Sequence, residues 1–203
     1  MASYPVPARQ ATAEVREKGS RFLAMVSAAG GEQEARAVLA GLARNHPDAT
    51  HLCWAWRLGW PPRERSSDAG EPAGTAGVPM LRALRGAGLS DVLAVVVRWF
   101  GGVKLGKGGL ARAYAAAVRA ALEQLPTAIR VPRVRLAISA PLTRIGAVKR
   151  LVHPPEVKIE SETYGGPAGA ALVLSVEEDR RAGLEAALAA LQVTIEQVAE
   201  PIR

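Results

Sequence analysis

The sequence predicts an α+β protein of two domains, residues 1–130 and 131–203. The first domain carries the whole net charge of +7, with 17 Lys and Arg against 10 Asp and Glu, whereas the second domain is neutral. Residues 126–132, which begin and end with proline, interrupt the apolar periodicity as a linker does. Beyond them, strand and helix patterns follow in the order β-α-β-β-α-β, which is the order of a ferredoxin-like sandwich.

The elements of the first domain follow from period-two alternation for strands and from helical spacing for helices. Strands are expected at 12–15, 21–27, 50–58 and 92–97, and helices at 32–44, 78–85 and 110–125. The strand at 92–97 is apolar at every position, which is typical of a central strand covered on both faces. Residues 1–10 are expected to form a tail or an edge segment. Residues 59–77 show no periodicity, so they are expected to form a long loop.

The strand at 50–58 separates two sets of side chains. Trp54 and Trp56 belong to one face, which we expect to be core, and His51, Cys53 and Arg57 belong to the other. We expect this second face to be either solvent or a site. Cys53 is interpreted as a small buried hydrophobic residue rather than a nucleophile.

The elements of the second domain alternate more regularly. Apolar residues predict strands at 134–138, 156–164, 170–176 and 193–198, with helices at 142–152 and 177–190.

Composition limits the class of protein. Apolar runs are too short to span a bilayer, and the first ten residues lack the features of a signal peptide. One cysteine excludes an internal disulfide and fits a reducing compartment, so a cytoplasmic location without membrane contact is expected. The three histidines have no metal-ligand spacing, and neither a metal nor a cofactor is expected. The basic first domain suggests an anionic partner, although a merely solvated surface would show the same charge.

The candidate binding site is a glycine-rich, basic segment that follows the central strand. Glycines between a strand and a helix let backbone N–H groups approach an oxyanion, and flanking cations add attraction. The segment lacks the Walker A pattern, because Lys107 is followed by glycine, and it lacks G-x-G-x-x-G. The residues expected to contact an anion or nucleic acid are Arg98, Gly101, Gly102, Lys104, Gly106, Lys107, Gly108, Gly109 and Arg112. The alternative is that the glycines serve only tight turns and helix packing.

A second loop offers polar side chains that could support this site: Ser67, Asp68, Glu71 and Thr75. Asp68 and Glu71 could act as an acid/base pair, with His51 as a further weak catalytic candidate. The alternative, which we favour, is that the two carboxylates bond loop N–H groups or pair with Arg98 and the loop lysines.

These residues resemble the IMPACT/YigZ family of small cytoplasmic proteins. The resemblance rests on SSDAGEPAGTAGVPML (66–81) and VVVRWFGGVKLGKGGLARAYAAAV (95–118), supported by KGSRFLA (18–24) and HPDATHLCWAW (46–56). It implies a first domain like the second domain of small-subunit ribosomal protein five and domain IV of elongation factor G. It also implies a ferredoxin-like second domain similar to domain V of that factor.

The resemblance also implies a function. Eukaryotic members act in translational control by binding a co-activator of the amino-acid-starvation kinase and blocking kinase activation, with the help of an additional RWD domain. No such domain fits this sequence, so the kinase-control role is not carried over. Bacterial-type members are thought to bind nucleic acid. We therefore expect a non-enzymatic, translation-associated protein that binds RNA or the ribosome. The alternatives are an enzyme acting on a phosphorylated or nucleotide-like molecule, and a protein-interaction module whose second domain docks a partner.

Overall fold

The computed structural model describes residues 3–165 and 169–198. The chain divides into two compact units, Tyr4–Arg130 and Val131 onward, and each is described by itself. Both units combine an antiparallel sheet with helices, as expected of an α+β protein.

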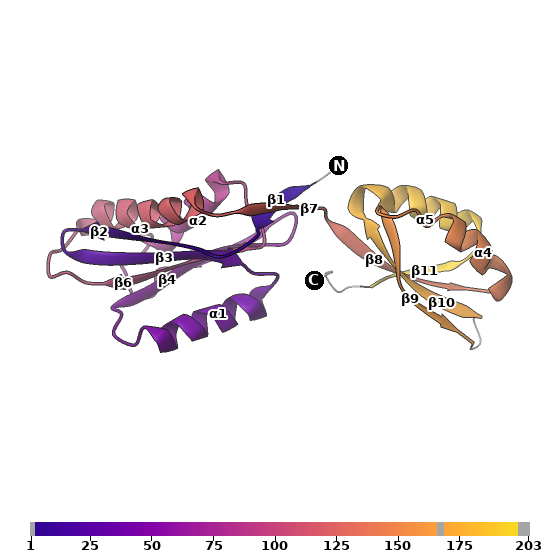
Figure 1. Ribbon diagram of the computed structural model, residues 1–203, viewed down its shortest axis with the longest axis horizontal. Coiled ribbons are helices and arrows are strands. Elements are labelled where there is room, and N and C mark those ends of the chain that lie inside the picture. The colour runs from indigo at the N-terminus through magenta and orange to yellow at the C-terminus, as the bar shows by residue number, and fades with distance from the viewer. Residues whose placement is uncertain (1–2, 166–168, 199–203) are drawn as a thin grey trace. The chain divides into compact units, whose positions relative to one another are not determined.

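The first unit is built on a five-stranded antiparallel sheet in the order β2-β3-β6-β4-β5. Helix α1 covers one face of this sheet, while α2 and α3 cover the other (Figure 1). The strands are β2 Ala11–Glu17, β3 Ser20–Ala28, β4 His51–Leu58, β5 Arg63–Ser67 and β6 Val92–Trp99. The helices are α1 Glu32–Asn45, α2 Gly77–Gly86 and α3 Gly106–Glu123.

The central strand β6 explains why the sheet needs helices on both faces. Every residue from Val92 to Arg98 is buried. Val92, Ala94 and Val96 pack into the core under α2 and α3, whereas Leu93 and Val95 pack on the side of α1. This arrangement confirms the central, doubly covered strand that the continuous apolar run predicts.

Three features of this unit differ from the expectations. Residues 59–77 are not all loop, because β5 pairs with β4 at the sheet edge. The linker expected at 126–132 contains β7 Thr127–Arg130, which pairs with β1 Tyr4–Pro7. Helix α3 begins at Gly106 rather than at residue 110, so it takes in the last glycines of the basic segment.

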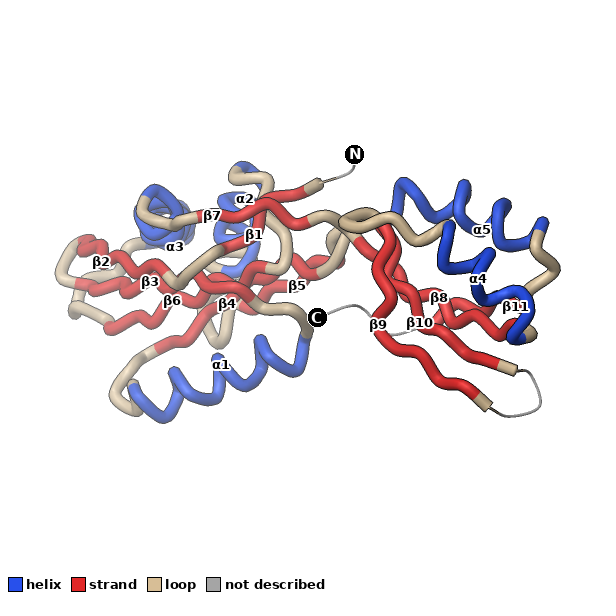
Figure 2. Tube along the Cα trace, turned by 45° about the vertical axis from the view of Figure 1, so that its right-hand side comes forward, coloured by secondary structure: helices blue, strands red, loops and turns tan. Residues whose placement is uncertain are grey.

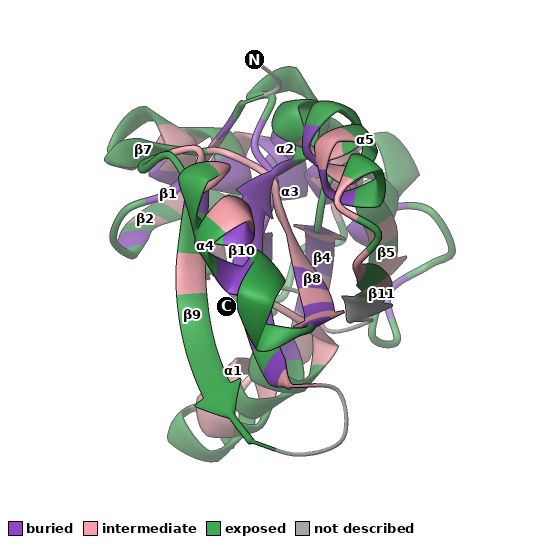
Figure 3. Ribbon diagram, turned by 90° about the vertical axis from the view of Figure 1, so that its right-hand side faces the viewer, coloured by how far each residue is buried: buried purple, intermediate pink, exposed green. Residues whose placement is uncertain are grey.

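The second unit has the predicted β-α-β-β-α-β order. Its strands are β8 Arg133–Ala140, β9 Val157–Tyr164, β10 Ala170–Glu177 and β11 Thr194–Val198, and its helices are α4 Leu142–Arg150 and α5 Arg181–Ala190. The sheet order β11-β8-β10-β9 is that of a ferredoxin-like sandwich. Helices α4 and α5 lie on one face of the sheet (Figure 2), and their buried residues pack against those of β8 and β10. The edge strand β9 is exposed along most of its length (Figure 3).

Within the described ranges, no helix is long and apolar enough to cross a membrane.

Candidate nucleic-acid interface

The glycine-rich segment connects β6 to α3 and supplies the first turn of that helix. Residues 100–105 form the connection, and Gly106, Gly108 and Gly109 lie within α3. The first backbone N–H groups of a helix have no partner inside the helix. In α3 no side chain caps them, and the first turn holds no acidic residue. The start of α3 is therefore a positive helix end next to lysines, which suits an anion.

The connection is held against the turn between β2 and β3 by contact of backbone on backbone. A Cβ atom at Gly101 would lie 1.8 Å from the carbonyl carbon of Gly19, so only glycine fits at position 101. The Gly101 N–H donates to Ser20 Oγ at 3.2 Å. This packing brings Lys18, which is exposed at the β2–β3 turn, to the basic segment. Spacing along the sequence does not predict this contact, because the two turns are distant in the chain.

The exposed cations of this region are Lys104, Lys107 and Arg112. The Arg112 guanidinium lies beside the start of α3, since a Cβ at Gly108 would be 3.4 Å from Arg112 Nη1. We call the surface formed by Lys18, Lys104, Lys107 and Arg112, together with the start of α3, the loop surface. Farther along α3, Arg119 lines a surface hollow of about 510 Å³ together with Arg82 of α2.

Arg98 does not belong to the loop surface, although it was expected to contact an anion. Its guanidinium is 6% exposed and forms an ion pair with Glu71, with 2.5 Å between Nη1 and Oε1. Nη2 donates to Ser20 Oγ at 3.3 Å. A buried guanidinium held in this way cannot reach a phosphate in solvent. Arg98 instead fixes the end of β6 from which the segment departs.

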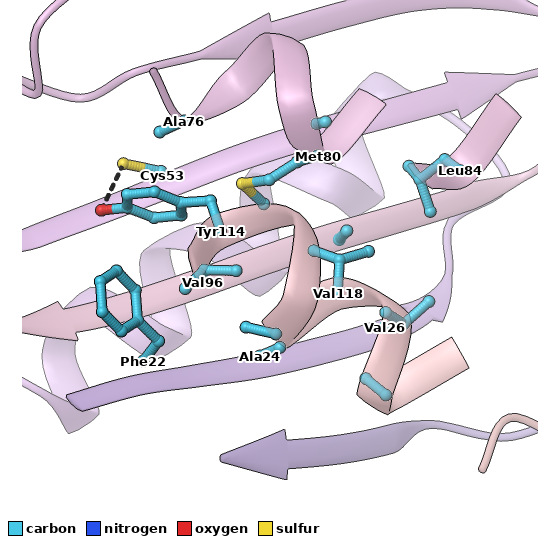
Figure 4. Close-up of a cluster of buried hydrophobic side chains, with 14 of the residues drawn as sticks. Phe22, Ala24, Val26, Cys53, Ala76, Met80, Leu84, Val96, Tyr114 and Val118 are labelled. Carbon is cyan, nitrogen blue, oxygen red and sulfur yellow. Dashed lines mark hydrogen bonds between the residues drawn. The ribbon is translucent and has the colours of Figure 1, made fainter. Parts of the chain in front are cut away.

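Glu71 and Arg98 are part of a buried polar network on the α3 side of the sheet. The Tyr114 hydroxyl donates to Glu71 Oε1 at 2.7 Å. The Cys53 thiol donates to the Tyr114 oxygen at 3.3 Å, the bond drawn in Figure 4. The Phe22 ring packs edge-on against Tyr114, with 5.1 Å between centroids. Burial raises the pKa of Cys53, the bond to Tyr114 lowers it, and the nearby carboxylates of Glu71 and Asp68 raise it. The net result is a pKa of about 12. Cys53 is thus the buried, unreactive thiol that was predicted.

The β4 face that carries Cys53 is neither solvent nor an open site. Cys53 and Ala55 are fully buried in the core under α2 and α3. Arg57, on the same face, donates from Nη1 to the Leu89 carbonyl at 2.5 Å and from Nε to Glu64 at 2.8 Å. The prediction for this face is wrong because helices cover both faces of the sheet.

The loop before α2 is organised by Asp68. Its carboxylate accepts N–H groups from Gly74, Ala76 and Gly77 at 2.8–2.9 Å. Burial raises the pKa of Asp68, but these three bonds outweigh it and hold the pKa below its usual value. Ser67 accepts from the Ala69 N–H, and Thr75 donates to the Pro72 carbonyl, so both bond to their own loop.

His51 lies at the edge of this network. Its Nδ1 is 2.9 Å from the Ala69 carbonyl oxygen, so Nδ1 carries a proton, and its Nε2 is 3.9 Å from Glu71 Oε2. The three weak catalytic candidates therefore lie close together, with His51 of β4 against the loop that holds Asp68 and Glu71, yet both carboxylates bond to the protein itself. This agrees with the alternative that the sequence favoured, in which the carboxylates bond loop N–H groups and Arg98. Among the residues that the structure describes, no cluster of His, Cys, Asp and Glu could hold a metal ion.

Comparison with known proteins gives consistent results. Residues 18–122 match the profile of the Impact N-terminal domain. The chain is 40% identical to an IMPACT family member from Haemophilus influenzae, over 88% of this chain and 87% of that protein. It is 38% identical to the IMPACT family member YigZ from Escherichia coli, over 81% of this chain and 82% of that protein.

A solved structure described as a hypothetical protein is similar over the whole length. It shares 34% identity and a TM-score of 0.75, covering 98% of this chain and 99% of that one. The segments that carry the resemblance in the sequence are those that build the β6–α3 connection and the Asp68 loop. On these grounds the chain belongs to the IMPACT family.

Proposed function

We propose that this protein is a non-enzymatic, translation-associated protein that binds RNA, free or in the ribosome, through the loop surface. Phosphate groups would contact Lys104, Lys107 and Arg112, and the uncapped backbone N–H groups at the start of α3 would donate to a phosphate oxygen. The link to translation comes from the family, whose eukaryotic members act in translational control.

The observation that carries the proposal is the division of the cations of the first unit into paired and unpaired sets. Eight arginines form ion pairs with carboxylates: Arg16, Arg21, Arg36, Arg57, Arg65, Arg85, Arg98 and Arg130. In the described part of the chain, the other nine cations of this unit form none: Arg9, Lys18, Arg44, Arg63, Arg82, Lys104, Lys107, Arg112 and Arg119. Of these, Lys18, Lys104, Lys107 and Arg112 lie together at the loop surface, and no acidic residue occurs from 92 to 122. Their charge is therefore not neutralised by the protein and remains available to an external anion.

The alternative of an enzyme finds less support in the same geometry. The carboxylates of Asp68 and Glu71 are occupied by loop N–H groups, Arg98 and Tyr114. A general base needs an accessible lone pair within hydrogen-bond reach of a substrate proton. This supports the role of the two carboxylates as structural supports for the loop.

The test is the binding of a fluorescent single-stranded RNA to the wild type and to Lys104→Glu/Lys107→Glu, measured by anisotropy across a salt series. Each phosphate contact contributes about −0.7 to the slope of log K against log salt for a single strand. Losing two contacts should therefore flatten the slope by about 1.4 and weaken binding at every salt concentration.

The matched control is Arg150→Glu/Lys158→Glu, which changes the net charge equally in the second unit, where both side chains are exposed. It should leave the slope close to that of the wild type. The proposal fails if the wild type retains no RNA, if its affinity does not depend on salt, or if both double variants lose affinity equally.

A further inference from the structure

An exposed aromatic side chain stands at the start of the β6–α3 connection. Phe100 is 47% exposed, whereas every residue of β6 before Trp99 is buried. The neighbouring Trp99 is engaged by the protein: its Nε1 donates to Asp48 at 2.8 Å, and the Arg21 guanidinium lies 4.4 Å from its ring centroid. Phe100 thus offers a free ring where Trp99 does not.

The position of Phe100 is fixed from both sides. Its backbone N–H donates to Thr50 Oγ1 at 3.0 Å, and the next residue, Gly101, is locked against Gly19. Arg98 Cζ lies 5.7 Å from the Phe100 ring centroid, within the range of a cation–π contact. Arg98 is buried and ion-paired with Glu71, so this cation keeps a fixed place beside the ring. An aromatic ring held in this way has little conformational entropy to lose on binding.

The surroundings of the ring indicate what it would bind. Lys104 is four residues farther along the chain, so the two Cα atoms are at most about 14 Å apart. Val103 between them is 52% exposed. A ring and an apolar side chain followed by unpaired cations match the chemistry of a nucleotide, which presents an apolar base face and a charged phosphate.

We propose that Phe100 is a stacking platform for an unpaired RNA base, whose neighbouring phosphates contact Lys104 and Lys107. The inference rests on the proposed function and narrows it to single strands, loops or ends of RNA. A paired base is already stacked between its neighbours and cannot lie on the ring, so the loop surface alone would contact a duplex. The ring therefore selects unpaired RNA, and the lysines add affinity for any RNA.

The test compares an oligouridine of about 10 nucleotides with a blunt RNA duplex of similar length, using the full chain. Two variants separate stacking from apolar contact: Phe100→Leu keeps an apolar side chain without a π face, and Phe100→Trp enlarges the π face. Phe100→Leu should weaken oligouridine binding roughly 5- to 150-fold, the range measured for loss of one base–aromatic stack, and leave duplex binding unchanged. Phe100→Trp should match the wild type or bind more tightly.

The matched control is Tyr164→Leu, which removes an exposed aromatic ring from the second unit; Tyr164 is 54% exposed. It should bind oligouridine as the wild type does. Thermal melts of all variants establish that they are folded.

The outcomes separate this inference from the function on which it rests. Salt-dependent RNA binding that Phe100→Leu leaves unchanged would overturn the stacking platform and keep the proposed function. Tighter binding to the duplex than to oligouridine would also overturn the platform. Absence of binding to both RNAs would overturn the proposed function itself.

Discussion

Replacing Glu71 by Gln should destabilise the first unit strongly, because it leaves a buried cation without a counter-ion. Gln has nearly the same size as Glu, and its amide oxygen can still accept the hydrogen bond from the Tyr114 hydroxyl. The Arg98 guanidinium would then donate only to the Ser20 hydroxyl, at 3.3 Å, and to the uncharged amide oxygen of the new Gln side chain. The change removes a charge without creating a cavity, so its effect isolates the electrostatic contribution.

The magnitude follows from the burial of both partners. The side chains of Arg98 and Glu71 are 6% and 3% exposed, so water cannot solvate the cation once its partner is neutral. Breaking a buried ion pair from one side costs about 3–5 kcal/mol. This is a large part of the roughly 5–15 kcal/mol that stabilises a typical domain. It corresponds to a fall in melting temperature of roughly 10–25 °C for a unit of this size.

Tryptophan fluorescence is a suitable assay, because all four tryptophans lie in the first unit: Trp54, Trp56, Trp60 and Trp99. Urea unfolding followed by fluorescence therefore reports on that unit alone. The double variant Glu71→Gln/Arg98→Met should recover much of the loss, since replacing both charges removes the desolvation cost. A loss below about 1 kcal/mol for Glu71→Gln, or no recovery in the double variant, would refute the reasoning.

Two further predictions concern packing and protonation. Gly101→Ala places a Cβ 1.8 Å from the Gly19 carbonyl carbon, so the backbone must move and the unit should lose about 1–3 kcal/mol or more in urea unfolding. Gly41→Ala in α1 meets open space and should instead gain about 0.5–1 kcal/mol, which makes it the control. The second prediction concerns the Cys53 thiol, whose pKa rises in the folded state from 9.0 to about 12. Since only the unfolded thiol loses its proton between these values, stability should fall as pH rises from 9.0 to about 12, and a flat profile in a comparison with Cys53→Ala would contradict this. Iodoacetamide at about pH 8 should label Cys53 only in denaturant; rapid labelling of the folded protein would show that the thiol is accessible.

Periodicity predicted most elements because their side chains repeat with the period of the backbone. The helix expected at 32–44 and the strand at 92–97 differ from α1 and β6 by one or two residues at an end. The edge strand β5 was missed because its residues, RERSS, are all polar. Backbone pairing with β4 and the ion pair of Glu64 with Arg57 stabilise it instead. The pairing of β1 with β7 was missed for a related reason, since it joins the start of the unit to its end.

Local sequence located the basic segment, but it did not separate the buried Arg98 from the exposed residues that follow it. Glycines and lysines between a strand and a helix identify the segment, and the structure places it between β6 and α3 and in the first turn of α3. The sequence also places Arg98 two residues from Phe100, with no indication that one is buried and the other exposed. That difference arises from tertiary contacts: Arg98 is buried against Glu71 and Ser20, whereas Phe100 follows the last residue of β6 and is 47% exposed.

The sequence alone determined the family, the order of strands and helices in the second unit, most elements of the first unit and the position of the basic segment. Each of these depends on residue type and on short-range spacing, which can be read directly from the sequence. Only the tertiary structure decided which cations are neutralised and which remain free. The pairing of Arg98 with Glu71 and the contact of Gly19 with Gly101 depend on atoms that meet within a few ångströms across a folded sheet. Spacing along the chain does not encode such contacts. It is these contacts that separate Arg98, which has a structural role, from the loop surface that is proposed to bind RNA.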